Sequence, residues 1–316
     1  MSQVPVTKWA ESVAVSGDYV YLAESMVMPG TSRGYRGELR VIDISDPADP
    51  REVGVHDLDG SAKSMVVRGS HVLVAVFSND RVRIQDDPPV YRMIPRGELQ
   101  VIDVSDPANP RLVLIHPADA SWPEDLAVKD NLVLLLTRRY SPQKEERSRL
   151  QIIDFSDIAN PRELGAYEGS GWAITVTTGG DYAFVGWGFS NGSFGGLGRT
   201  EGTLDIIDMA DPAQPRRVGG SSAILSVSDL KLMGNQLFAA AADEGLVVLE
   251  LPPILRSMSH SGGQLHLSWE GFGPVRVEQA TRLTDPDWQD LGAPQTVNEY
   301  TLPASPDPRF FRLVRP

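Results

Sequence analysis

The sequence of 316 residues contains no cysteine, which excludes disulfides, thiolate catalysis and cysteine-based zinc sites. It has no run of eighteen apolar residues, so no segment is predicted to span a membrane. Basic residues are the minority, and the formal net charge of −13 argues against a nucleic-acid surface, which needs a concentrated basic face. Residues 1–12 lack the charged start and apolar core of a signal peptide. Neither a cofactor nor a nucleic-acid partner is expected.

One stretch is repeated along most of the chain. It reads LRVIDISDPADPREVGV from Leu39, and close copies begin at Leu99, Leu150 and Leu204. A shortened copy, LVVLELPP, begins at Leu246. Self-similarity at a period of roughly fifty residues indicates a repeat architecture.

Each repeat contains four segments with the composition of β-strands. In the first repeat, an apolar segment from Ser12 leads through the turn SGDY into YVYLA from Tyr19. After this segment come a loop, the LxVID segment, the SDPANP corner and a last apolar segment. Short runs of apolar residues between Gly, Asp and Asn turns are typical of antiparallel strands. Four such strands per repeat predict the blades of a β-propeller, and the nearly continuous apolar LxVID strand fits burial on both faces.

The predicted fold is all-β: a five-bladed β-propeller in residues 1–253 and a small β-sandwich in residues 254–316. The last repeat stops at Pro252 and Pro253 without an outer strand, whereas VPVTKWA, from Val4, precedes the first repeat. If this N-terminal strand completes the fifth blade, the ring closes without an exposed edge. After Pro253 the repeat disappears, and short strands between Gly, Pro and Asp turns predict the sandwich.

The chain resembles the LVIVD-repeat family, on the L-x-V-I-D-x-S-D-P-x-x-P core that follows a G-x-Y-V-Y-L-A-like segment. The resemblance implies an extracytoplasmic bacterial β-propeller (periplasmic, cell-surface or secreted) without an assigned activity, its signal peptide being absent from this sequence. In residues 254–316, LHLSW, VRVEQA and RFFRLV are similar to a fibronectin type III-like module of the kind found on secreted bacterial proteins.

Aspartates recur at the SDPANP corner, at Asp43, Asp46, Asp103, Asp106, Asp154, Asp157, Asp208 and Asp211. A calcium site needs six to eight oxygens that converge on one point, whereas one pair per blade is spread around a ring. A structural turn is therefore favoured, in which Asp46 accepts backbone N–H groups and Pro47 presets the backbone. His56 and His116 fall on separate blades, too far apart to share an ion. No metal site is predicted.

Four long loops are predicted on one face of the propeller, where the connections between blades also lie: Glu24–Gly37, Phe77–Gly97, Thr137–Arg149 and Gly186–Thr203. Together they hold twelve Lys or Arg residues against seven Asp or Glu. An anionic ligand can be steered toward such a face, although interleaved solvated charges explain the same count. The candidate ligand-binding residues in these loops are Tyr35, Arg36, Tyr91, Arg92, Arg138, Tyr140, Trp187 and Phe189.

Three tryptophans, Trp9, Trp122 and Trp172, share one repeat position where the chain enters a blade on that same face. Two residues further along, Glu11, Lys63 and Glu124 share another. Two interpretations stay open. The set can form an aromatic and charged funnel that binds a sugar or peptide, or the tryptophans can wedge between blades. Packing of the three tryptophans between blades is favoured.

The leading functional hypothesis is a non-enzymatic, extracytoplasmic binding scaffold that contacts a protein or glycan through the long-loop face. The alternative is a carbohydrate-active hydrolase with Glu11 and Glu124 as catalytic carboxylates. Such a pair requires a separation of about 5–10 Å and one raised pKa. The sequence does not indicate an oligomeric state.

Overall fold

The computed structural model describes residues 4–5, 8–27, 35–86, 89–118, 122–139, 147–189, 201–221, 227–241, 245–251, 254–270, 275–282, 287–295, 297, 299–305 and 309–314. These residues form strands and turns, and no helix occurs among them. The all-β prediction is confirmed. Within these ranges, no helix has the length and apolar character needed to cross a membrane.

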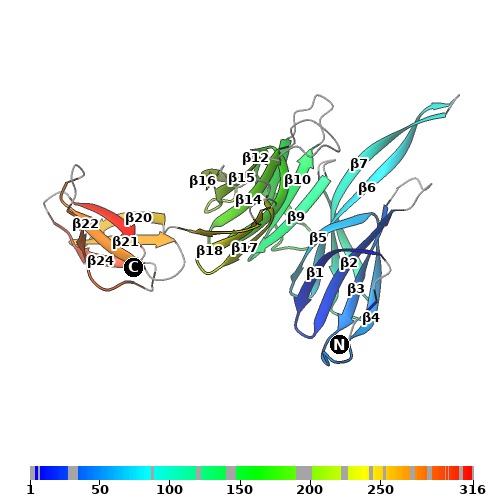
Figure 1. Ribbon diagram of the computed structural model, residues 1–316, viewed down its shortest axis with the longest axis horizontal. Helices are drawn as coiled ribbons and strands as arrows, with labels where there is room; N and C mark the ends of the chain where they lie inside the picture. The colour runs from blue at the N-terminus through cyan, green and yellow to red at the C-terminus, as the bar shows by residue number, and fades with distance from the viewer. Residues whose placement is uncertain are drawn as a thin grey trace. The chain divides into compact units, whose positions relative to one another are not determined.

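Each of the first four repeats forms one four-stranded antiparallel sheet, whose strands pair in chain order (Figure 1). The first repeat sheet contains β1 (Trp9–Ser16), β2 (Tyr19–Val27), β3 (Tyr35–Asp43) and β4 (Arg51–Leu58). The second contains β5 (Ser61–Arg68), β6 (His71–Asp86), β7 (Pro89–Asp103) and β8 (Arg111–Pro117). The third contains β9 (Trp122–Lys129), β10 (Leu132–Arg139), β11 (Arg147–Asp154) and β12 (Arg162–Ser170). The fourth contains β13 (Trp172–Gly179), β14 (Tyr182–Phe189), β15 (Glu201–Asp208) and β16 (Arg216–Ser221).

A tight turn joins the first two strands of every repeat. Its backbone is left-handed, with φ of +57° at Gly17 and +60° at Gly234 and similar values at Gly69 and Gly180. Asp130 adopts the same conformation, with φ of +53°. Glycine reaches this region without steric cost, so the recurring glycine fixes where each hairpin turns.

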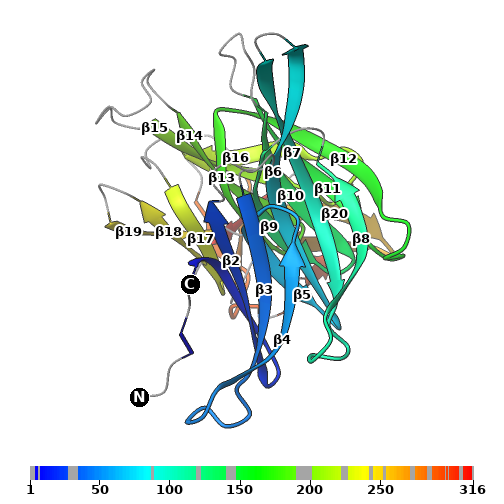
Figure 2. The ribbon, with the colours of Figure 1, turned by 90° about the vertical axis from the view of Figure 1, so that its right-hand side faces the viewer.

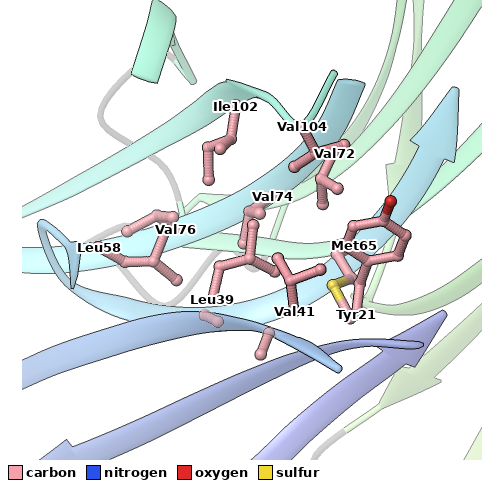
Figure 3. Close-up of a cluster of buried hydrophobic side chains, with 12 residues drawn as sticks. Tyr21, Leu39, Val41, Leu58, Met65, Val72, Val74, Val76, Ile102 and Val104 are labelled. Atoms are coloured by element: carbon pink, nitrogen blue, oxygen red, sulfur yellow. The ribbon is translucent and has the colours of Figure 1, made fainter. Parts of the chain in front are cut away.

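The LxVID strand of the second sheet is buried because neighbouring sheets cover both of its faces: Leu99 and Val101 of β7 belong to the core shared with the third sheet, and Ile102 to the core shared with the first. Leu39 and Val41 of β3 are fully buried against residues of the second sheet, including Val74 (Figure 3). Along β6, Val74 belongs to the core shared with the first sheet, whereas Leu73 and Ala75 belong to the core shared with the third. A third core joins the third and fourth sheets. Burial on both faces explains why these strands are apolar at successive positions.

Consecutive sheets pack around their first strands. Strand β1 contacts β5, β5 contacts β9, and β9 contacts β13. The end of the sheets at which these first strands begin and the second strands finish is called the loop end. The opposite end, which carries the SDPANP corners, is called the corner end. The contacts between consecutive first strands establish an all-β repeat architecture, while the five-bladed closed ring stays a prediction.

The corner of one repeat presses on the outer strand of the repeat before it. A Cβ added to Gly54 of β4 would lie 2.1 Å from the carbonyl oxygen of Pro107, and one added to Gly165 of β12 would clash with the next corner in the same way. Between the second and third sheets the equivalent residues are Leu114 and Ile158, which both pack on the shared core. The glycine is therefore required only where a proline corner follows it.

The fifth repeat forms a three-stranded sheet of β17 (Val227–Met233), β18 (Gln236–Ala241) and β19 (Gly245–Glu250). No N-terminal strand pairs with β19 in the residues that the structure describes. Instead, Arg40 of β3 donates to the carbonyl oxygen of Pro5 at 3.1 Å, and Lys8 forms an ion pair with Glu38. Closure of the ring by the segment from Val4 is thus not observed and stays a prediction.

One predicted loop is a β-hairpin. Within Phe77–Gly97, β6 and β7 continue as paired strands as far as Asp86 and Pro89. Figures 1 and 2 show the two strands running together beyond the strands beside them. Valine, isoleucine and tyrosine in RVRI and VYRMI favour this extension, and the two prolines between those segments end it.

The chain divides into two compact units, residues 1–230 with 241–245, and residues 231–240 with 246–316. The C-terminal part holds two three-stranded sheets, ordered β20–β21–β24 and β23–β22–β25. Their strands are β20 (Ile254–Ser261), β21 (Gln264–Glu270), β22 (Arg276–Ala280), β23 (Gln289–Asp290), β24 (Glu299–Pro303) and β25 (Phe310–Val314). Buried residues such as Leu267, Trp269 and Val277 form their core. The domain boundary after Pro253 stays a prediction.

Candidate binding site at the loop end

The first strand of each of the first four repeat sheets begins with a β-bulge at the loop end. The pairing with the second strand skips one residue, which is Glu11 in β1, Lys63 in β5, Glu124 in β9 and Ile174 in β13. A bulge leaves its extra residue outside the ladder and turns the strand locally. The repeat position shared by Glu11, Lys63 and Glu124 is therefore a bulge position, and its side chain differs from sheet to sheet.

Directly after its bulge, Asp125 links three repeat sheets. Its Oδ1 accepts the hydroxyl of Ser64 at 2.7 Å and the N–H of Leu126 at 2.8 Å. Its Oδ2 accepts the hydroxyl of Thr175 at 2.9 Å and the N–H of Val176 at 2.8 Å. Burial raises the pKa of Asp125, and the four donors offset part of that rise. This carboxyl holds the first strands of the second, third and fourth sheets together.

Neighbouring sheets also touch through side chains at the loop end. In each case the first residue of one sheet's first strand contacts a residue on the second strand of the sheet before it. Ser61 donates to the hydroxyl of Ser25 at 3.0 Å. One sheet further, the ring centroids of Trp122 and Phe77 lie 4.9 Å apart. The same pair of repeat positions thus carries a hydrogen bond in one case and an aromatic contact in the next.

Arg138 extends this contact into the fourth sheet. Its guanidinium carbon lies 4.6 Å from the ring centroid of Trp122 and 4.9 Å from that of Trp172. Phe77, Trp122, Arg138 and Trp172 form what is called the aromatic–arginine stack. Cation–π attraction is strongest where water is excluded, so the stack joins three sheets at the loop end. In this arrangement Trp122 and Trp172 act as wedges between sheets.

Glu124 lies beside the stack. Its Oε1 forms an ion pair with Nε of Arg138 at 2.8 Å. Burial raises the pKa of Glu124, and the positive charges of Arg138 and Lys63 offset only part of that effect. The buried indole N–H of Trp122 has no hydrogen-bond partner in the described residues. An acceptor that reached this corner would find this donor.

Trp9 is the exposed member of the three aligned tryptophans. It is 66% exposed, and Glu11 and Lys63, on the neighbouring first strands, are exposed too.

Two predicted loop residues take structural positions. Trp187 is not in a loop: it lies in β14, is fully buried, and donates its indole N–H to Asp205 at 2.9 Å. A fully buried side chain offers no contact surface in this arrangement, and the ligand-binding role of Trp187 stays a prediction. Arg36 lies on β3 and forms an exposed ion pair with Asp57.

The other predicted contact residues cannot be placed. The side chains of Tyr35, Tyr91, Arg92 and Phe189 lie outside the described residues, although their backbones belong to strands. Tyr140 lies wholly outside them. These four aromatic residues and one arginine stay predictions as ligand contacts.

The corner aspartates hold backbone groups. Oδ1 of Asp43 accepts the N–H of Ser45 at 2.8 Å, and Oδ1 of Asp46 accepts the N–H of Ala48 at 2.9 Å. The same two bonds recur in the next three repeats, at Asp103, Asp106, Asp154, Asp157, Asp208 and Asp211. The bond to Ser45 lowers the pKa of Asp43. Among the described residues, no group of three or more His, Asp or Glu is placed to hold a metal ion.

Sequence reasoning missed Asp125. A signal was present, because the repeat position directly after the bulge residue carries a side-chain oxygen each time, at Ser12, Ser64, Asp125, Thr175 and Asp229. Ser12 makes the corresponding link between the first two sheets, accepting the N–H of Met65 at 3.2 Å. A recurring polar residue inside an apolar strand indicates a buried hydrogen bond.

Comparison with known proteins gives a family match over part of the chain. The LVIVD repeat matches residues 9–28, 34–57 and 94–116, which lie in the first two repeat sheets. No curated protein matches the chain. Among solved structures, the computationally designed Ika4 protein matches with 15% sequence identity and a TM-score of 0.40. The matched region covers 61% of this chain and 93% of the Ika4 chain. That likeness is too distant to carry a functional argument.

Proposed function

We propose that this LVIVD-repeat protein is a non-enzymatic binding scaffold whose ligand, a protein or a glycan, contacts the loop end around Trp9. The observation that carries the proposal is the exposure of Trp9. Its counterparts Trp122 and Trp172 pack against a neighbouring sheet, whereas Trp9 leaves about two thirds of its surface in water. Large exposed aromatic side chains are enriched at binding surfaces because they bury much area with little loss of conformational freedom.

The surroundings of Trp9 support a mixed polar and apolar ligand. Glu11 and Lys63 provide exposed charges of opposite sign on adjacent first strands. An exposed indole with an acceptor on its own strand and a donor on the adjacent strand suits a sugar ring or an extended peptide. The rigid sheets below hold these residues in place, which limits the entropy lost on binding.

The test is a screen of the full-length chain on glycan and peptide arrays, followed by titration of the selected ligand. Trp9→Ala is expected to weaken binding about tenfold or more, because an aromatic anchor at the centre of a contact supplies much of its affinity. Val15→Ala is the matched control. Val15 lies on the same strand, is similarly exposed at 64%, and is further from the loop end.

Two results would contradict the proposal. One is an affinity that falls equally in Trp9→Ala and Val15→Ala, since the ligand would then not be centred on the loop end. The other is catalytic turnover of any array ligand.

One observation favours hydrolysis as a second candidate function. Burial raises the pKa of Glu124, as a general acid requires. Against it, Arg138 lies at the Glu124 carboxylate and is itself held in the aromatic–arginine stack. If the protein is a carbohydrate-active hydrolase with Glu11 and Glu124 as its carboxylates, Glu124→Gln abolishes turnover of a chromogenic glycoside. A wild-type chain that turns over none removes this candidate.

The proposal also covers the number of blades, the closure of the ring and the type of the C-terminal module. We infer five blades, with the segment from Val4 closing the ring, and a fibronectin type III-like C-terminal module of the kind found on secreted proteins. The five sequence repeats and the face-to-face packing of the first four sheets support the propeller. An extracytoplasmic location, periplasmic, secreted or at the cell surface, rests on the family resemblance. Fractionation of the native cells tests the location.

A further inference from the structure

A histidine in the C-terminal part of the chain joins two hydroxyl groups. Nε2 of His266 lies 3.1 Å from the hydroxyl oxygen of Ser261, and Nδ1 lies 3.1 Å from the hydroxyl oxygen of Thr301. The three residues belong to β20, β21 and β24, which form one antiparallel sheet. Ser261, His266 and Thr301 are called the C-terminal triad.

The C-terminal triad lies on the face of its sheet that points away from the core. On β21, His266 stands between Leu265 and Leu267, whose side chains pack in the core of the two C-terminal sheets. Successive side chains of a strand point to opposite faces, so the imidazole lies on the outer face. Thr301 is opposite His266 in the ladder, and both Ser261 and Thr301 are exposed. A molecule from solution can therefore reach the Ser261 hydroxyl.

The backbone after Ser261 leaves room for such a molecule. Gly262 and Gly263 form the tight turn to β21 with φ of +58° and +74°, and a Cβ on either would meet no described heavy atom within 4 Å. Among the described backbone hydrogen bonds of turns and loops, none uses the N–H of either glycine. The N–H that follows a nucleophile can stabilise the oxyanion formed when a carbonyl is attacked. The turn thus offers an open approach and an unused donor.

The C-terminal triad has the parts that activate a hydroxyl. A serine hydroxyl is a weak nucleophile until a base takes its proton, and a histidine within hydrogen-bond reach, oriented by a third group, supplies that base. In the tautomer whose Nδ1–H donates to Thr301, Nε2 of His266 carries the lone pair that accepts the Ser261 proton. Ser259, on the same strand, is also exposed, but the described hydrogen bond to the ring comes from Ser261.

We propose that Ser261 is a covalent modification site that accepts an acyl group from an activated ester. Its Oγ forms a bond to the ester carbonyl carbon while its proton passes to Nε2 of His266. The bond from that carbon to the leaving oxygen then breaks, and the leaving oxygen takes the proton from the imidazole. The product is an acyl ester of Ser261. The inference goes beyond the proposed function, because it concerns the C-terminal part and not the loop end.

The test uses the full-length chain and p-nitrophenyl acetate as the acyl donor. After an acid quench and digestion, mass spectrometry locates and counts the acetyl groups. Ser259 is the internal control, since it is exposed and lies directly opposite His266 in the ladder. Ser261 is expected to be acetylated at least about tenfold faster than Ser259, which is below the usual gain from a positioned general base because the site is open to water.

Two variants separate the base from its surroundings. His266→Gln keeps a hydrogen-bonding side chain but removes the base, and is expected to slow acetylation of Ser261 about tenfold or more. His260→Gln is the matched control: His260 is exposed and lies opposite Leu265, so it belongs to the other face, and its loss is expected to leave the rate within about twofold. The wild-type rate is expected to rise with pH and then level off, whereas the rate of His266→Gln keeps rising with hydroxide.

Thr301 is a positioning residue, because it acts through the imidazole. Thr301→Val keeps the shape and removes the hydroxyl at Nδ1, so acetylation of Ser261 is expected to slow by about twofold to tenfold. Thr301→Ser restores the hydroxyl and is expected to restore the rate. A purely structural role would not be rescued through the hydroxyl alone.

Three results would overturn the inference. They are equal acetylation of Ser261 and Ser259 in the wild type, an unchanged rate in His266→Gln, and an equal loss of rate in His260→Gln. The first comparison is made within one folded chain, so it does not depend on how any variant folds. Failure here leaves the proposed function intact, because that proposal is tested by array binding and by Trp9→Ala.

Discussion

Replacing Asp125 with alanine removes the acceptor that four donors share. The side chain accepts the hydroxyls of Ser64 and Thr175 and the backbone N–H groups of Leu126 and Val176. The hydroxyls can rotate toward other acceptors after the change. The N–H groups are fixed by their strands, so both are left without the carboxylate inside the sheet contact.

The size of the effect follows from two opposing terms. A hydrogen bond to a charged group contributes about 1.5–3 kcal/mol, and an unsatisfied buried N–H costs about 1–3 kcal/mol. In the other direction, burial raises the pKa of Asp125, so alanine also removes the cost of keeping a charge out of water. We expect the free energy of unfolding to fall by about 3 kcal/mol, which lowers Tm by roughly 6–12 °C for a unit of this size.

Thermal and urea unfolding, followed by circular dichroism, measure the change. Asp229→Ala is the matched control: Asp229 occupies the same repeat position, and its described bond is to the N–H of Leu230 at 2.8 Å. That variant is expected to lose about 1 kcal/mol or less. If Asp125→Ala stays within about 0.5 kcal/mol of the wild type, or is no less stable than the control, Asp125 does not hold the sheets together.

Three further predictions concern the framework and the stack. Gly54→Ala is expected to lose about 1–3 kcal/mol in urea unfolding because its Cβ meets the carbonyl oxygen of Pro107; an unchanged midpoint would contradict this contact. Asp130→Gly is expected to gain up to about 1 kcal/mol, since φ of +53° suits glycine, and a loss would show that the aspartate side chain matters more. Arg138→Gln removes a charge that lowers the pKa of Glu124. The pH midpoint of tryptophan fluorescence should therefore move to higher pH, and a shift to lower pH would refute the pairing.

The repeat itself made the sheets predictable. Alternating turns and apolar runs located the strands, and glycine marked the tight turns because few other residues adopt the left-handed backbone. The corner aspartates are predictable as turn residues because one pair recurs in each of the first four repeats, and the structure describes backbone bonds at each. The shared position of Trp122 and Trp172 also placed both residues at one end of neighbouring sheets.

Features that depend on a specific neighbour were not predictable in this way. Trp187 is predicted in the loop Gly186–Thr203, but β14 runs through this position and Asp205 on the adjacent strand accepts its indole N–H. The extension of β6 and β7 is predicted as the loop Phe77–Gly97 because it departs from the repeat, although RVRI and VYRMI have strand composition. Arg138 was identified as a loop candidate, yet its role comes from two tryptophans on different sheets, which no local pattern reveals.

The measurement that tests the central claim most directly is a paired titration of one array-selected ligand against variants at the two ends of the sheets. Trp9→Ala changes the loop end, where the repeats differ, and Asp106→Ala changes the corner end, where they agree. We predict that Trp9→Ala weakens binding at least tenfold without lowering Tm, whereas Asp106→Ala lowers Tm and leaves affinity unchanged. Weakened binding in Asp106→Ala with full affinity in Trp9→Ala would place the function at the corners and contradict the account.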